Sequence, residues 1–162
     1  MALEIERKFL LKHLPALDGA AATDMVQGYL RADREASVRV RIADERAWIT
    51  IKGPAKGWTR QEYEYPVPAD DAREILHLAI GALVEKRRYT LRQQGYEWEI
   101  DVFRGANAGL TLAEVELPSE DAELALPSWI GDEVTDDPRY LNSSLCRKPY
   151  ADWGPGAQSR SS

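Results

Sequence analysis

Three charged residues near the start of the chain are spaced so that they fall on one face of a strand. Glu4, Glu6 and Lys8 share one side of an extended segment, because successive side chains of a β-strand point to opposite faces. Carboxylate oxygens bind hard divalent cations such as Mg²⁺ and Mn²⁺, and an ammonium group binds phosphate oxygens. The row therefore predicts a divalent metal and an anion bound next to each other.

The same alternation recurs along most of the chain, and the polar faces of the later segments are strongly biased toward charge. Cations and acids are grouped by segment, whereas an ordinary solvated face mixes charged residues with neutral polar ones. After the first row, the charged residues on these faces are Arg39, Arg41, Lys52, Glu62, Glu64, Lys86, Arg88, Glu97, Glu99, Asp101, Glu114 and Glu116. This bias indicates that the first row belongs to a large charged site.

An antiparallel barrel of eight strands would gather these faces if their apolar sides point outward. A central channel lined by Arg and Lys suits a polyanion, and the acids would hold Mg²⁺ or Mn²⁺. Metal and cations together are the usual means of phosphoryl transfer. Two alternatives need no ligand. The charged rows could be solvated outer faces, or they could neutralise one another as structural salt bridges, which is costly inside a protein.

The periodicity and the turn residues predict many strands and few helices, which places the chain in the α+β class with mainly β structure. Strands are expected at residues 2–11, 25–32, 36–43, 46–53, 59–67, 83–93, 96–104 and 110–117. Helices are expected from Asp70 to Gly81, over 119–126, and from about 138 to 146. One domain over residues 1–153 is expected, followed by a disordered tail rich in Gly, Pro and Ser over 154–162.

The composition excludes several classes of partner. The 162 residues carry a formal net charge of −6 with a pI near 5.0, which argues against non-specific binding to nucleic acid. The single cysteine, Cys146, allows no intrachain disulfide and fits a reducing cytoplasm. No apolar run reaches membrane-spanning length, so no membrane partner is expected. An exposed edge or outer apolar face could support a homodimer.

In their order along the chain, these residues resemble the CYTH superfamily, also called the triphosphate tunnel metalloenzymes. The Glu-x-Glu-x-Lys signature of that family corresponds here to Glu4 through Lys8. Further matches follow at Val38-Arg39-Val40-Arg41, Thr50-Ile51-Lys52, Glu62-Tyr63-Glu64, and in residues 85–89, 98–103, 112–117 and 134–142. The resemblance covers nearly the whole chain and implies an eight-stranded antiparallel tunnel that binds a triphosphate.

The resemblance also implies roles for individual residues. Phosphate oxygens would be held by Lys8, Arg39, Arg41, Lys52, Lys86 and Arg88, with Glu114 also at the substrate. The metal ligands would be Glu4, Glu6, Asp101 and Glu116, while Glu62 and Glu64 could hold a second metal or orient the cations. Tyr29 is either a packing residue or, with Lys8, a group that places the attacking water. Arg139 or Lys148 could close one mouth of the tunnel.

Metal-dependent hydrolysis of inorganic tripolyphosphate to pyrophosphate and orthophosphate is the leading hypothesis, because the sequence offers no evident nucleobase pocket. A class IV adenylate cyclase, which converts ATP to cyclic AMP and pyrophosphate, is the main alternative. The family's cyclases tend to carry a His-Phe pair near the N-terminus, whereas His13 is followed here by Leu14. A nucleoside or thiamine triphosphatase and a non-catalytic sensor of polyphosphate or nucleotides are further alternatives. The full set of acids favours catalysis over a sensor.

Overall fold

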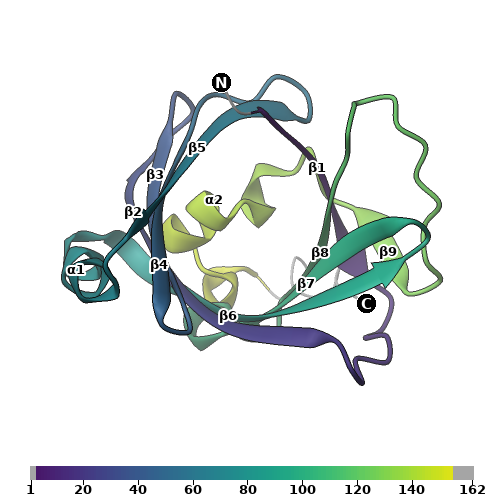
Figure 1. Cartoon of the computed structure of the whole chain (residues 1–162), viewed down its shortest axis with the longest axis horizontal. Coiled ribbons are helices and arrows are strands. Elements are labelled where there is room, and N and C mark those ends of the chain that lie inside the picture. The colour runs from purple at the N-terminus through teal and green to yellow at the C-terminus, as the bar shows by residue number, and fades with distance from the viewer. Residues whose placement is uncertain (1–2, 155–162) are drawn as a thin grey trace.

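The computed structural model describes residues 3–154 and shows a β-barrel with its helices at the margins and at one end (Figure 1). The strands are β1 (Leu3–Leu11), β2 (Ala21–Ala32), β3 (Ser37–Ala43), β4 (Arg46–Lys52), β5 (Thr59–Val67), β6 (Ile80–Gln93), β7 (Tyr96–Arg104), β8 (Thr111–Glu116) and β9 (Ile130–Glu133). The helices are α1 (Ala69–Ile75) and α2 (Asn142–Arg147), with 3₁₀ turns η1 (Leu76–Leu78), η2 (Gly105–Asn107), η3 (Pro138–Tyr140) and η4 (Tyr150–Asp152).

The first strand closes the barrel. Neighbouring strands follow the order β5-β4-β3-β2-β6-β7-β8-β1, and the first residues of β1 also pair with β5, where Glu4 lies opposite Arg60. On its other edge β1 pairs with β8, where Glu6 lies opposite Glu116. The predicted eight-stranded antiparallel barrel is confirmed. The short strand β9, which the sequence did not predict, pairs with the end of β1 beyond the contact with β5.

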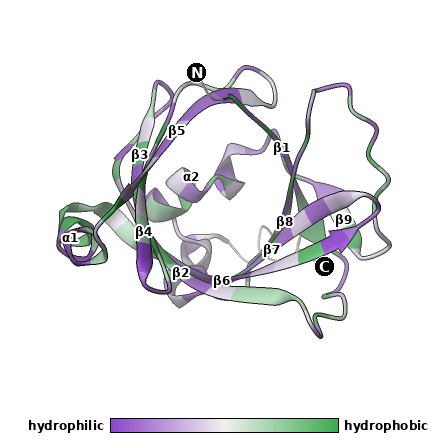
Figure 2. Ribbon diagram, viewed as in Figure 1, coloured by the Kyte–Doolittle hydropathy of each residue, from purple (hydrophilic) through white to green (hydrophobic). Residues whose placement is uncertain are grey.

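Strand alternation separates a charged inner face from an apolar outer face. On β3, Arg39 and Arg41 point to the inside, while Val40 is completely buried on the outside. Val40 packs in a cluster with Ala72 of α1, which lies against the outer wall (Figure 1). Figure 2 shows hydrophilic residues interspersed with hydrophobic ones along the strands around the barrel. The arrangement leaves the interior free for charged side chains.

The segment between β8 and β9 covers another part of the outer wall, and it is not helical. The helix predicted over 119–126 is wrong, because these residues form a turn followed by chain without regular secondary structure. Ala122 and Leu124 are half-buried against the cluster around Trp98, while Glu123 between them is exposed. That spacing of two residues is the period of extended chain. Trp98 completes this cluster by edge-to-face contact with Trp129, at 5.6 Å between ring centroids.

The C-terminal part of the described chain folds onto one end of the barrel. The helix predicted from about 138 to 146 occurs as η3 and α2, which are separated by Leu141 in an extended conformation. In Figure 1, α2 lies inside the outline of the barrel. Its buried residues Leu145 and Cys146 join a core cluster with Tyr140 and Trp153. This packing holds the start of α2 against the barrel interior.

Other helices and strands begin a few residues away from their predicted boundaries. The strand predicted from residue 83 begins at Ile80, and the strand predicted from residue 25 begins at Ala21. The helix predicted from Asp70 is α1 followed by η1. From residue 155 on, the predicted disordered tail lies outside the described residues. Within residues 3–154, no helix has the length and apolar character needed to cross a membrane.

Candidate active site

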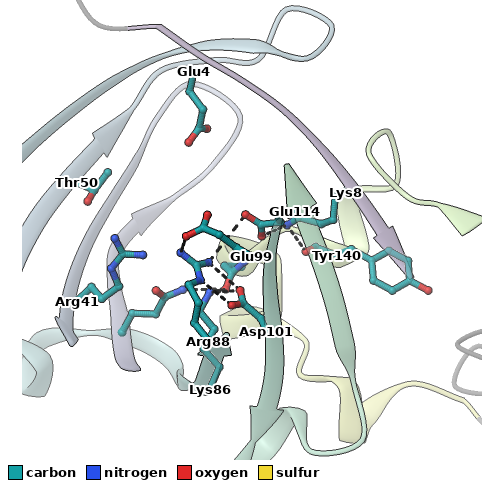
Figure 3. Close-up of polar contacts among 12 residues, drawn as sticks. Glu4, Lys8, Arg41, Thr50, Lys86, Arg88, Glu99, Asp101, Glu114 and Tyr140 are labelled. Atoms are coloured by element: carbon teal, nitrogen blue, oxygen red, sulfur yellow. Dashed lines mark hydrogen bonds and ion pairs between the residues drawn. The ribbon is translucent and has the colours of Figure 1, made fainter. Parts of the chain in front are cut away.

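The inward-facing charged side chains of the barrel line one cavity, part of which is drawn in Figure 3. Its cations are Lys8, Arg39, Arg41, Lys52, Arg60, Lys86 and Arg88. Its acids are Glu4, Glu6, Glu62, Glu64, Glu99, Glu114 and Glu116. The remaining lining residues are Tyr29, Ser37, Leu141, Asn142 and Ser143. A cavity with so little apolar surface suits a small, highly charged ligand better than a base or a ring.

One wall is organised around a buried aspartate. Asp101 lies 2.8 Å from the Lys86 ammonium and accepts two hydrogen bonds from the Arg88 guanidinium, at 2.7 and 2.9 Å. Burial alone would raise the pKa of Asp101, but Arg88 and Lys86 hold it well below its usual range. Burial lowers the pKa of Lys86 to about 8, although Asp101 opposes that change. Asp101 thus orients two cavity cations, Lys86 and Arg88, from a buried position outside the cavity lining.

A second acid fixes the N-terminal lysine. Lys8 Nζ lies 3.4 Å from Glu114 Oε1 and donates a 2.9 Å hydrogen bond to the backbone carbonyl of Tyr140 (Figure 3). Arg88 approaches the other carboxylate oxygen of Glu114 to 4.0 Å. Burial would raise the pKa of Glu114, but these cations, Lys8 foremost, lower it to about 2. The glutamate is therefore ionised and orients cations at neutral pH.

The first residue of α2 reaches into the same network. The side-chain oxygen of Asn142 accepts hydrogen bonds from Lys86 Nζ at 3.0 Å and from Gln27 Nε2 at 2.9 Å. Gln27 on β2 is completely buried. The C-terminal segment thus helps to set the direction of Lys86, which lies 56 residues earlier in the chain.

On another side of the cavity, cations of β3 and β4 face acids of β1 and β5. Lys52 Nζ donates to both carboxylate oxygens of Glu4, at 2.9 and 3.0 Å, and lies 3.6 Å from Glu62. Arg39 and Arg41 each lie 3.7 Å from Glu64. The Nε atoms of both arginines are buried and have no hydrogen-bond partner among the described residues. Such orphaned donors favour an anionic ligand.

Three acids near the start of β1 and the end of β8 resist ionisation. Burial raises the pKa of Glu6 to about 7, and the neighbouring Glu114 carboxylate adds to the effect. Burial also raises the pKa of Glu4, against the pull of Lys52, and that of Glu116, where Glu4 contributes as a second negative charge. A divalent cation would relieve this repulsion.

The donor chemistry of these acids fits Mg²⁺ or Mn²⁺. Among residues 3–154, no three His, Cys, Asp or Glu side chains converge into a preassembled metal site. Mg²⁺ is commonly held by only one or two carboxylates, with substrate phosphates and water completing its octahedron. Glu4, Glu6 and Glu116 therefore fit an ion that is shared with a phosphate ligand.

Comparison with known proteins agrees with this geometry. Residues 2–148 match the family model of the CYTH domain. The chain belongs to the CYTH domain family. An inorganic triphosphatase of Acetivibrio thermocellus is 45% identical over 151 residues, which cover 93% of this chain and 97% of that protein. An inorganic triphosphatase of Nitrosomonas europaea is 40% identical over 147 residues, which cover 88% and 95% of the two chains.

A solved structure shares the architecture of this CYTH domain. The crystal structure of an inorganic triphosphatase superposes with a TM-score of 0.67 at 36% sequence identity, and the match covers 90% of this chain and 95% of that one. The barrel is therefore common to this chain and a protein named for triphosphate hydrolysis.

The CYTH barrel brings nearly all of the predicted site residues to one cavity. Asp101 is the exception, because it lies behind Lys86 and Arg88 and does not line the cavity. Arg139 and Lys148, considered as a closing group, lie near Trp153 outside the cavity. Tyr29 lines the cavity and also packs in the core, so both of its interpretations agree with its position.

Several residues in or beside the cavity of the CYTH domain were given no role from the sequence, although Glu99 was already counted among the charged residues of the inner faces. Arg60 and Glu99 share faces with predicted site residues, so strand alternation would have been enough to find them. Thr50 stands directly between Arg39 and Glu64, but a threonine in a strand carries no signal of its own. Asn142 ends the 134–142 stretch that resembles the family, but that match assigned it no role, since its role depends on where α2 docks.

Proposed function

We propose that the protein is a divalent-metal-dependent inorganic triphosphatase, which hydrolyses tripolyphosphate to pyrophosphate and orthophosphate. The observation that carries this proposal is the cavity itself, whose lining is almost entirely charged and in which Tyr29 and Leu141 are the only large carbon-rich side chains among the described lining residues. A nucleobase or thiazole ring would find no apolar or aromatic slot there. The likeness to two proteins named inorganic triphosphatase supports the same substrate.

The cations of the cavity would bind the phosphate oxygens. Arg39 and Arg41 offer planar guanidinium groups for bidentate contacts, and Lys8, Lys52 and Lys86 add point charges. Arg88 completes the set opposite Glu99. Together they would stabilise the negative charge that develops on the departing pyrophosphate. Lys8 and Tyr29 are the groups that we assign to the orientation of the attacking water.

The acids divide into two groups in this proposal. Glu4, Glu6 and Glu116 would hold Mg²⁺ or Mn²⁺, which when bound supplies Lewis-acid neutralisation of the phosphate oxygens. The others, Glu62, Glu64, Glu99, Asp101 and Glu114, orient the cations, since each of them lies within 4.0 Å of a lysine or arginine. Glu4 would serve in both groups, because it also accepts two hydrogen bonds from Lys52. For Asp101 this assignment differs from the metal-ligand role implied by the family resemblance.

The test is a parallel assay of the purified protein with Mg²⁺ or Mn²⁺ on tripolyphosphate, ATP and thiamine triphosphate, with products resolved by phosphorus NMR. Pyrophosphate and orthophosphate should form fastest from tripolyphosphate, and a chelator should stop the reaction. Arg41→Gln should lose most of the activity, while Arg92→Gln, which removes an exposed arginine at a hairpin, should retain it. Cyclic AMP from ATP would identify a cyclase, and binding of all three compounds without turnover would identify a sensor.

A further inference from the structure

Glu64 occupies the place between Arg39 and Arg41 in the cavity. Its Oε2 atom lies 3.7 Å from the NH2 atom of each arginine. The same oxygen accepts a 2.8 Å hydrogen bond from the hydroxyl of Thr50, which in turn accepts a 3.3 Å bond from Arg39. One carboxylate oxygen thus meets two guanidinium groups and a hydroxyl, which is the kind of donor set that a phosphate oxygen seeks.

The ion pairs of Glu64 with the two arginines are longer and more exposed than those deeper in the cavity. The side chain of Glu64 is 35% exposed, whereas those of Arg39 and Arg41 are 10% and 13% exposed. The arginine contacts are 3.7 Å long, against 2.7 Å for Arg88 with Asp101. The Nε atoms of Arg39 and Arg41 stay without partners among the described residues. Glu64 is therefore the more exposed partner of two largely buried arginines, and it holds them through long ion pairs.

We propose that Glu64 is a positioning residue that stands in for a substrate phosphate in the free enzyme. Its carboxylate neutralises and orients Arg39 and Arg41 until a triphosphate takes its place, and it returns when the products leave. This inference rests on the proposed function. Because Glu64 competes with every anion for Arg39 and Arg41, only an anion that binds strongly enough can displace it. A triphosphate contacts many cations and displaces Glu64. An orthophosphate or pyrophosphate product contacts fewer cations and is expelled more readily.

Glu64→Gln tests the proposal, because the amide keeps the size of the side chain and the acceptor for Thr50 but removes the charge. Binding of tripolyphosphate and of pyrophosphate is measured by calorimetry in the presence of a chelator, so that neither metal nor turnover contributes. Both anions should bind about three- to ten-fold more tightly to the variant than to the wild type, the size expected from partly exposed ion pairs. With metal, KM for tripolyphosphate and the inhibition constant of pyrophosphate should both fall.

Glu45→Gln is the matched control, since it removes one negative charge from the exposed turn between β3 and β4, and it should leave both affinities unchanged. Equal or weaker binding by Glu64→Gln under chelation would overturn the proposal. A variant that gains affinity for the metal-free anions supports it, even if the wild type proves not to hydrolyse tripolyphosphate. A wild type that does not hydrolyse tripolyphosphate would reject the proposed function but not the role of Glu64. The failure of the proposed function and the failure of this inference are therefore distinguishable.

Discussion

The carboxylate of Asp101 lies 2.8 Å from the ammonium of Lys86, and both side chains are only 1% exposed. Arg88 binds the same carboxylate through two of its nitrogens. Two cations of the cavity are therefore held by an acid that no ligand in the cavity can reach. A buried ion pair of this kind adds little net stability, but the loss of one partner is severe, since it leaves an uncompensated buried charge.

Asp101→Asn should for this reason destabilise the barrel strongly. The amide cannot neutralise Lys86 and Arg88, so the free energy of unfolding should fall by about 3–5 kcal/mol. Urea denaturation followed by tryptophan fluorescence measures this change. Glu99→Gln is the matched comparison, because Glu99 pairs with the same Arg88 at 3.0 Å but its side chain is 39% exposed. That variant should lose no more than about 1 kcal/mol. Equal losses would show that burial of Asp101 is not the cause.

The strands and the charged interior could be predicted because both follow from the alternation of polar and apolar residues with a period of two. Arg39 and Arg41 reach the same cavity as Glu4 without any knowledge of the strand order, because alternation already assigns the inner face. The same rule explains the error at 119–126, where Ala122 and Leu124 follow that period although the polar residues around them predict a helix. Local periodicity decides which face a residue lies on.

Local periodicity does not decide how deeply a side chain is buried or which residues it contacts across the barrel; tertiary packing does. Asp101 lies on the inner side of its strand, but only the positions of Lys86 and Arg88 determine that it is hidden behind them. Asn142 reaches Lys86 because α2 docks on β6 and β2, which depends on the packing of Leu145 and Cys146. These are properties of the assembled core, and no window of sequence contains them.

The acid side of the stability profile should depend on Glu114. Its pKa is about 2 in the folded protein, below its ordinary value of 4.5, so its carboxylate stabilises the fold above pH 4.5. That contribution, about 3 kcal/mol for a shift of this size, should be lost as the pH falls from 4.5 toward 2. The free energy of unfolding of the wild type and of Glu114→Gln, measured between pH 2 and 6, should therefore converge at low pH. Parallel profiles would exclude a linkage to this group.

Asn142→Ala should weaken the binding of triphosphate. The change removes the acceptor shared by Lys86 and Gln27, so the ammonium loses one of the contacts that direct it. Hydrogen bonds to charged groups contribute about 1.5–3 kcal/mol, so KM for tripolyphosphate should rise about ten-fold or more. Ser143→Ala, at the next position of α2 and also in the cavity lining, should change KM much less. A fall in kcat at unchanged KM would contradict a role in binding.

The docking of α2 should depend on the absence of a side chain at Gly81. Gly81 has a positive φ of 63°, and a Cβ atom there would collide with the backbone carbonyl oxygen of Cys146. Gly81→Ala should therefore push α2 away from the cavity in addition to straining the backbone, with a cost of about 2 kcal/mol or more. Gly95→Ala is the matched control, because Gly95 also has a positive φ, 81°, but a Cβ atom there would meet nothing within 4 Å.

Both glycine variants should lose stability to thermal denaturation, since both force alanine into the left-handed region. Only Gly81→Ala should raise KM for tripolyphosphate, because displacement of α2 separates Asn142 from Lys86 and the carbonyl of Tyr140 from Lys8. Hydrogen exchange of the backbone amides in residues 140–148 should accelerate in the same variant and not in Gly95→Ala. Equal KM values for the two variants would mean that the cavity keeps its cations in place without α2.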